Sequence, residues 1–196
     1  MSDFILTSEN YINRLNEALR RLDHKAVETL ANDLMNAWVN KQTVFIAGNG
    51  GSSANALHIA NDLHYGVGCR SADCNIPGIR VDALTGNAAV LTCLANDTGY
   101  DNIFSNQLQV KGGCGDLLIV LSGSGNSKNI INAIKIAKKM GIRTHAILGF
   151  DGGESKKLAD NLLHVEIYDM QIAEDLQLII GHLCMQWLNK NNFKVE

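Results

Sequence analysis

The stretch "FIAGNGGSSANALHIANDL", residues 45–63, joins an apolar run, a glycine-rich turn and a polar segment in that order. The apolar run begins at residue 43, and its β-branched and aromatic residues predict a buried strand over 43–48. The polar segment predicts a helix from about Ser53 to His64. Glycines between a strand and a helix bring backbone N–H groups close to a ligand, most often a phosphate. The stretch therefore predicts a phosphate site after the first strand.

The same strand, loop and helix pattern returns further along the chain. The run "DLLIVLSG" (116–123) predicts a buried strand, and "SKNIINAIKIAKKM" (127–140) predicts an amphipathic helix that stops at Gly141. Apolar, β-rich runs predict further strands within 79–84, 144–150 and 162–169, and helices are expected over 87–95, 101–110 and 170–188. Near-continuous apolar strands that alternate with helices indicate an α/β fold, a three-layer doubly wound parallel sheet covered on both faces.

The first forty residues are helical in pattern and precede the first strand. Asp23 is a suitable N-cap between two helices, whose apolar faces carry Tyr11, Leu15, Ala18 and Leu22 in the first and Val27, Leu30, Leu34 and Trp38 in the second. Two helices ahead of a sheet indicate packing against another subunit. We therefore expect an N-terminal helical oligomerisation segment over 1–42 and a domain that carries the sheet over 43–196, the two forming a single globular unit overall.

Composition excludes several classes of function. The 196 residues are 46% apolar, enough for a substantial core, and the net charge of −3 comes without a block of lysine or arginine. Such a chain is not expected to bind nucleic acid or an anionic membrane. It has no apolar stretch of membrane-spanning length, and residues 1–15 lack a signal-peptide run, so a cytoplasmic protein is expected. Five scattered cysteines without a Cys-x-x-Cys pair indicate reduced thiols.

Both glycine-rich loops lie where a doubly wound sheet binds its ligands, at the carboxyl ends of the strands. The hydroxyls of Ser122, Ser124 and Ser127, with backbone N–H groups, can hold a phosphate without a basic side chain. The alternative is that each loop is only a tight turn between a strand and a helix. That explanation is less convincing for two such loops together than for one alone. Nucleotide binding is disfavoured because neither loop has a Gly-Lys-Ser/Thr ending, and Ser53 and Lys128 stand where the dinucleotide fingerprint needs its third glycine.

Two histidines and two carboxylates have spacings that suit a metal. His58 and Asp62, four apart on a predicted helix, share one face, while Glu174 and His182, eight apart, lie on one side of the last helix. Imidazole nitrogens and carboxylate oxygens are usual zinc ligands. From the residues alone, a helix ion pair and a buried core histidine are the favoured interpretation.

Four motifs, in order and over the whole chain, resemble one family. The segments "GNGGSSANALHIANDL", "LANDTGYDNIFS", "LSGSGNSKNIINAI" and "AEDLQLIIGHL" are similar to those of the sugar isomerase (SIS) domain. Within it they resemble the phosphoheptose isomerases, which interconvert sedoheptulose 7-phosphate and D-glycero-D-manno-heptose 7-phosphate. The resemblance implies a flavodoxin-like fold, one zinc ion per subunit and a homotetramer.

The resemblance also assigns roles to individual residues. It implies that the sugar is bound by Asn49, Gly50, Gly51, Ser52, Asn96 and Asp97, and the phosphate by Ser122, Gly123, Ser124 and Ser127. It places the metal on His58, Asp62, Glu174 and His182, with Asp62 and Glu174 also facing the substrate. Asp62 and His182 are then the candidates for the acid and base that carry an aldose–ketose isomerisation through an enediol.

Several positions depart from the family pattern. Asp62 replaces a glutamate, Glu174 a glutamine and Gly123 a threonine, while Gly66 stands in place of an arginine for which Arg70 or Arg80 could substitute. The leading hypothesis is a zinc-dependent isomerase of a seven-carbon sugar phosphate that supplies heptose for lipopolysaccharide, capsule or glycoprotein. The alternative is a non-catalytic SIS module that binds a phosphosugar or a protein partner, of the replication-initiator-associating type. Retention of both histidines and both carboxylates favours the enzyme.

Overall fold

A five-stranded parallel sheet forms the centre of the computed structural model, which describes residues 2–71 and 74–192. The strands are β1 (Thr43–Gly48), β4 (Arg80–Ala83), β5 (Leu117–Ser122), β6 (Arg143–Leu148) and β7 (Asn161–His164), in the order β4-β1-β5-β6-β7. The register pairs Gly48 of β1 with Leu121 of β5, so the two strands end side by side. The predicted parallel α/β sheet is confirmed.

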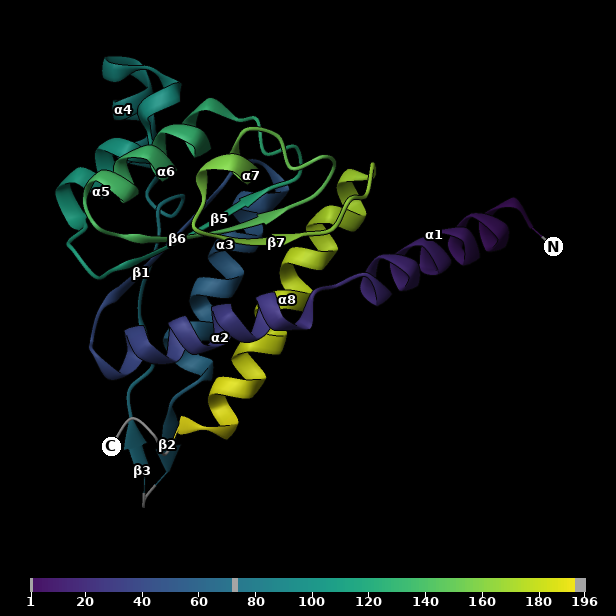
Figure 1. The fold of residues 1–196 in the computed structure, drawn as a ribbon, viewed down its shortest axis with the longest axis horizontal. Helices are drawn as coiled ribbons and strands as arrows, with labels where there is room; N and C mark the ends of the chain where they lie inside the picture. The colour runs from purple at the N-terminus through teal and green to yellow at the C-terminus, as the bar shows by residue number, and fades with distance from the viewer. Residues whose placement is uncertain (1, 72–73, 193–196) are drawn as a thin grey trace.

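Helices cover both faces of the sheet (Figure 1). One face carries α2 (His24–Val39), α3 (Gly51–Asn61) and α8 (Met170–Lys190), and the other carries α5 (Ser105–Lys111), α6 (Lys128–Lys139) and the short α7 (Ser155–Leu158). Side chains along a strand point alternately to the two faces. Ile119 of β5 is therefore buried on the α2 side, and Leu118 and Val120 on the α6 side. Each face has its own apolar core, as expected for a three-layer fold.

The second N-terminal helix belongs to this core. Asp23 caps α2 as predicted, because its carboxylate accepts hydrogen bonds from the backbone N–H groups of Lys25 and Ala26. Leu34 and Trp38 are only 2% and 5% exposed within the single chain, and the Trp38 indole donates to the Pro77 carbonyl. The expectation that Trp38 and the α2 face bury against other subunits is wrong, since the sheet and α8 already cover them.

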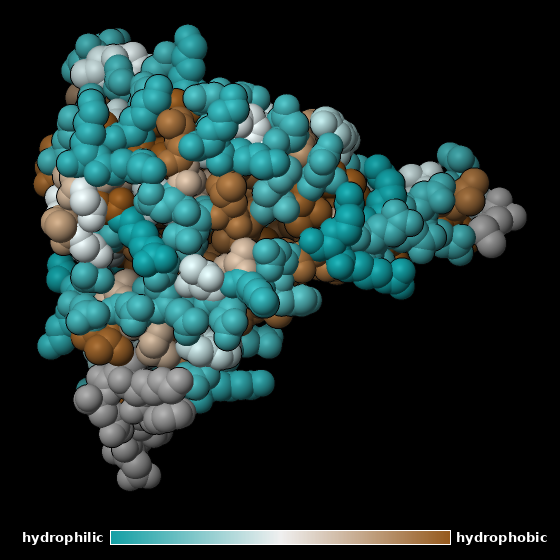
Figure 2. Space-filling view, viewed as in Figure 1, coloured by the Kyte–Doolittle hydropathy of each residue, from teal (hydrophilic) through white to brown (hydrophobic). Residues whose placement is uncertain are grey.

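The first helix, α1 (Asp3–Arg20), projects from the body of the protein (Figure 1). Two polar contacts join it to the start of α8: Tyr11 donates to Asp175 (2.5 Å), and Arg14 pairs with Asp169 (2.7 Å). Figure 2 shows a small apolar patch near the free end of this arm, where Phe4, Ile5 and Leu6 are exposed, and Ile12 is exposed further along the helix. The arm is thus the part of the N-terminal segment that remains uncovered in one chain.

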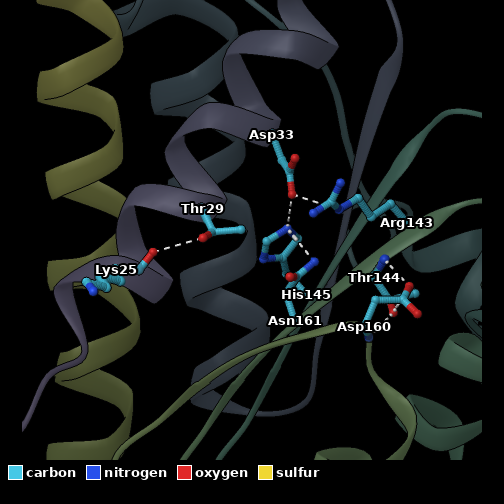
Figure 3. A network of polar contacts seen from close by, with 8 residues as sticks. All are labelled: Lys25, Thr29, Asp33, Arg143, Thr144, His145, Asp160 and Asn161. Carbon is cyan, nitrogen blue, oxygen red and sulfur yellow. Dashed lines mark hydrogen bonds and ion pairs between the residues drawn. The ribbon is translucent and has the colours of Figure 1, made fainter.

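A buried polar network fastens α2 to the amino end of β6 (Figure 3). His145 has no solvent exposure, and its Nε2 lies 2.7 Å from a carboxylate oxygen of Asp33 on α2. The same oxygen is 2.9 Å from Nε of Arg143. On the other side of β6, Thr144 bonds to Asp160 through both its backbone N–H and its hydroxyl. This network lies at the sheet edge opposite the glycine-rich loops.

Several short elements were not predicted. The helix after the first loop begins at Gly51 and continues beyond Asn61 as a π-helical turn over Asp62–Gly66, and α4 (Ala88–Thr98) is followed by a 3-10 turn over Tyr100–Asn102. β2 (Cys69–Ser71) and β3 (Cys74–Ile76) form a small antiparallel hairpin. Strands this short are below the length at which an alternating pattern is visible in a sequence. Among the described residues, no helix has the length and apolar character needed to cross a membrane.

Candidate functional site

The two glycine-rich loops lie next to each other because β1 and β5 are neighbours in the sheet. Two reciprocal hydrogen bonds, each 2.9 Å, join the side-chain amide of Asn49 in the first loop to that of Asn129 behind the second. The Tyr100 hydroxyl donates to the same Asn49 oxygen. Gly50 is the N-cap of α3 and has a φ of +55°, a backbone conformation that residues other than glycine rarely adopt. The two loops therefore form one rigid unit.

A pocket of about 270 Å³ opens between the loops. It is lined by Asn49, Gly50, Gly51, Ser52, Leu121, Ser122, Gly123, Ser124, Ser127, Met170 and Glu174. No lysine or arginine is among them. Three helices begin here instead: α3 at Gly51, α6 after its N-cap Ser127, and α8 at Met170. Helix N-termini carry unpaired N–H groups and a partial positive charge, so this pocket suits an anion.

The three predicted serines differ in what their hydroxyls do. Ser122 is buried, and its oxygen accepts a hydrogen bond from the Gly125 backbone N–H, which closes the loop. The Ser124 oxygen accepts from the backbone N–H of Asn126. Ser127 is the N-cap of α6, but its side chain makes no capping hydrogen bond. Each hydroxyl hydrogen can still be donated to a ligand in the pocket.

The third wall of the pocket is the first turn of α8. The carboxylate of Glu174 packs directly against the α-carbon of Gly51 at the start of α3. Behind it, Gln177 donates to the Ser52 hydroxyl (3.0 Å), and Asn55 donates to both the Gln177 side chain and the Glu174 carbonyl. These buried, mutually satisfied amides fix α8 against α3.

A second cluster lies further along the same two helices. His58 of α3, Asp62 at its end and His182 of α8 bring one ligand atom each to a common point, all within 4.8 Å of one another. The two Nε2 atoms are 2.9 Å apart, and each is 3.5 Å from Oδ2 of Asp62. Asp62 opens the π-helical turn, a distortion that is frequent at functional sites. His182 is 43% exposed, so the interpretation as a buried core histidine is wrong.

This cluster fits a tetrahedral metal ion. Zinc binds imidazole nitrogen and carboxylate oxygen at about 2.0–2.2 Å, which places tetrahedral ligand atoms roughly 3.3 Å apart. The three distances of 2.9, 3.5 and 3.5 Å are close to that value. Three protein ligands leave one position open, as in catalytic zinc sites. Glu174 is not among these three described residues: it precedes His182 by eight positions on α8, and its carboxylate lines the pocket beside Gly51.

The remaining predicted site residues lie outside both groups. Asn96 and Asp97 are exposed at the end of α4, hydrogen-bonded to each other, and do not line the pocket. The Asp97 carboxylate accepts a hydrogen bond from the Cys93 thiol and thereby raises the pKa of that thiol. Arg80 is at the amino end of β4, where it donates to the Lys41 carbonyl, so it cannot serve the pocket at the opposite edge. The side chain of Arg70 lies outside the described residues.

Sequence reasoning missed Met170 and the amides of Asn129 and Gln177. Met170 follows Asp169, whose side chain caps α8 by accepting from the Ile172 N–H. That cap was a readable signal that a helix N-terminus begins there. The reciprocal amide pairs join segments far apart in the sequence, and no local pattern indicates them.

Comparisons with known proteins agree with this architecture. A family model described as the SIS domain matches residues 9–149. The phosphoheptose isomerase of Sulfurimonas denitrificans is 42% identical over 96% of this chain and 88% of its own length, and that of Aliarcobacter butzleri is 37% identical over 92% and 88%. Among solved structures, the phosphoheptose isomerase of Neisseria gonorrhoeae superposes with a TM-score of 0.85 at 26% identity, over 96% of this chain and 98% of that one.

Proposed function

The chain belongs to the SIS-domain family and, within it, is an isomerase of the phosphoheptose isomerase group, and we propose that it interconverts sedoheptulose 7-phosphate and D-glycero-D-manno-heptose 7-phosphate. The observation that carries this proposal is the arrangement of two sites along one pair of helices. The anion pocket lies where α3 and α8 begin, and the His58, Asp62 and His182 cluster lies about two turns further along both. At 1.5 Å of rise per residue, the two are roughly 10 Å apart. An extended seven-carbon chain with a terminal phosphate can span them.

In this proposal the phosphate lies in the pocket. Ser122, Ser124 and Ser127 donate hydroxyl hydrogens to it, and the N-termini of α3, α6 and α8 supply the compensating partial positive charge. Asn49, Gly50, Gly51 and Ser52 border the carbon chain, with the Glu174 carboxylate beside Gly51. Glu174 brings a negative charge close to the phosphate, so its carboxylate is better suited to sugar hydroxyls than to the phosphate itself. Asn96 and Asp97, on the exposed α4, remain proposed sugar contacts.

The proton transfers are assigned to Asp62 and His182. One takes a proton from the carbon beside the carbonyl to give an enediol, and the other returns a proton to the neighbouring carbon. Asp62 turns Oδ2 toward both imidazoles, so its other oxygen is the one proposed for proton transfer. His182 is 43% exposed, and because its Nε2 faces the metal site, the proton is proposed to move through its Nδ1. These contacts support the assignment.

We propose one zinc ion per subunit, held by His58, Asp62 and His182. When bound, zinc supplies a positive charge that stabilises the developing oxygen anions of the sugar. The near-tetrahedral spacing of the ligand atoms supports this choice, and the mixed nitrogen and oxygen set suits zinc better than magnesium or calcium. Glu174 is two turns from the cluster, so three protein ligands are proposed instead of four.

We further propose a homotetramer in the cytoplasm, with the N-terminal segment 1–42 contributing to assembly through α1. The exposed apolar side chains of that arm support the assembly, since closed symmetric oligomers are the common solution for such surfaces. A charged sugar phosphate does not cross a membrane unaided, which supports the location.

Two measurements on one preparation of the protein test this proposal. Purified protein is analysed for bound zinc and assayed for turnover of sedoheptulose 7-phosphate, with fructose 6-phosphate as the shorter control substrate. We expect about one zinc per chain and preferential turnover of the seven-carbon sugar. Tight binding of phosphosugars without turnover would contradict the proposal and favour a non-catalytic module. Turnover of the six-carbon sugar alone would contradict the assigned substrate.

A further inference from the structure

In each glycine-rich loop, a side chain from α8 occupies the space next to a glycine. A Cβ atom built on Gly51 would collide with the Glu174 carboxylate, and one built on Gly123 would lie 2.5 Å from Sδ of Met170 and 3.0 Å from its Cε. Met170 and Glu174 are one turn apart on α8, so they face the same side. The first turn of α8 thus docks into both loops at once.

Gly123 is needed for space and not for backbone conformation. Its φ is not in the left-handed region, unlike that of Gly125 two residues later at +68°. Any residue could adopt the backbone of Gly123, but the thioether of Met170 occupies the place that its side chain would take. The ring of Phe150 stands 3.6 Å from the same position and closes another side. A methyl group at 123 would therefore displace the thioether end of Met170, which lines the pocket.

Met170 is held over the loop by its position in the helix. It is the first residue of α8, directly after the N-cap Asp169, and the Asp169 side chain is fixed both by the Ile172 N–H and by Arg14. Met170 is 39% exposed, so part of its side chain packs and part faces the opening. Met170 and Leu121 are the two large apolar residues among those that line the pocket.

We propose that Met170 is a specificity-determining residue, an apolar wall that fixes the size of the phosphate end of the pocket through its contact with Gly123. This inference rests on the proposed phosphate role of the serine loop and not on the identity of the sugar. The large side chain at the phosphate end of the pocket comes from α8. The glycine at 123 therefore lets the loop backbone approach the ligand closely. Adding bulk to the loop as well overfills the site.

The experiment is a double-mutant cycle on the full chain, read out by the dissociation constant of inorganic phosphate in calorimetry and by KM for the phosphosugar. The variants are Gly123→Ala, Met170→Ala and the two combined. Gly113→Ala is the matched control, because Gly113 is off the pocket, has no positive φ, and its added Cβ would meet nothing closer than 3.8 Å. Met170→Leu keeps a similar apolar volume.

We expect Gly123→Ala to weaken phosphate binding and raise KM about tenfold. The combined variant should return to within about threefold of Met170→Ala, Met170→Leu should change KM less than Met170→Ala does, and the Gly113→Ala protein should resemble the wild type. A combined variant no better than Gly123→Ala, or a Gly123→Ala protein that binds phosphate normally, would overturn the inference. Absence of phosphate binding by the wild type would overturn it too. If the phosphate affinities of the variants change as expected but sedoheptulose 7-phosphate is not converted, the proposed function is wrong while the role of Met170 is supported.

Discussion

At the scale of single residues, the proposed anion pocket has no cationic side chain among the described residues that line it. Its polar groups are hydroxyls, amides and the N-termini of three helices, with the carboxylate of Glu174 beside Gly51. Neutral donors at helix N-termini can hold a phosphate, but each then carries a larger share of the binding. Single hydroxyl deletions should therefore be measurable.

We predict that Ser124→Ala and Ser127→Ala each weaken binding of inorganic phosphate and phosphosugar by about 1–3 kcal/mol, the value of a hydrogen bond to a charged group. The fold and the bound zinc should be unaffected, since neither side chain holds another element. Isothermal titration measures the affinity. Thr29→Ala is the control, because it removes a hydroxyl from α2 that bonds only to the Lys25 carbonyl. Unchanged affinity in both serine variants would refute the phosphate assignment.

The site residues were partly readable from the sequence. The glycines and serines of the two loops could be predicted because the residues that end a strand and begin a helix are neighbours in the sequence. His58 and Asp62 could be paired because four residues make about one helical turn. The place of Glu174 could not be read, because whether His182 or Glu174 reaches His58 depends on how α8 crosses α3. That crossing is fixed by Ser52, Asn55 and Gln177, which make contacts over long sequence separations.

At the scale of elements, α2 is tied to β6 by one buried histidine. Burial lowers the pKa of His145 from its ordinary value of 6.5, although the hydrogen bond to Asp33 opposes this. The Nδ1 atom is buried and has no hydrogen-bond partner among the described residues, so a second proton would add an unpaired donor. Arg143, Asp160 and Asn161 are the other polar groups around the ring. The folded state thus favours neutral His145.

This pKa has a consequence for stability. Below pH 6.5 the unfolded chain takes up a proton at His145 that the folded chain resists, so unfolding becomes easier as the pH falls. The contribution of neutral His145 to the free energy of unfolding is complete above pH 6.5 and is lost progressively below it. We predict a lower free energy of unfolding at pH 5 than at pH 7, measured by urea denaturation. His145→Gln should flatten this dependence, whereas the exposed His24→Gln should keep it. Equal stability of the wild type at the two pH values would refute the prediction.

Most elements of the fold followed from periodicity. The strands over 116–123 and 144–150 and the helix over 127–140 agree with β5, β6 and α6 to within two residues at each end, because long apolar or amphipathic runs leave little ambiguity. The strand expected over 162–169 ends at His164, where the chain leaves the sheet toward the cap of α8. The π-helical turn at Asp62 has no sequence signature, since an ordinary helix would show the same residues.

At the scale of the whole molecule, the α1 arm offers exposed apolar surface for the proposed assembly. The apolar face of α2 is used within the chain, but Phe4 is 79% and Ile12 53% exposed on α1. The arm also touches the active region, because Arg14 and Tyr11 hold the first turn of α8. Assembly through α1 would therefore fix the wall that carries Met170 and Glu174.

We predict that the wild type is a tetramer at micromolar concentration and that Phe4→Glu combined with Ile12→Glu lowers its mass, because two charges would have to be buried in the interface. Multi-angle light scattering measures the mass. Val110→Glu is the control, since Val110 is an exposed apolar residue on α5, away from the arm. A monomeric wild type, or a tetramer indifferent to both charges, would contradict assembly through α1.

The central claim is that the His58, Asp62 and His182 cluster binds the metal and carries the chemistry, and His182→Gln tests it most directly. Zinc content, turnover of sedoheptulose 7-phosphate and melting temperature are measured beside the wild type, with His24→Gln as a matched control on exposed α2 surface. We predict that turnover is abolished and zinc occupancy falls while the melting temperature changes little, since His182 is partly exposed and packs no core. His24→Gln should retain activity and zinc. A fully active His182→Gln protein with its full complement of zinc would contradict the account.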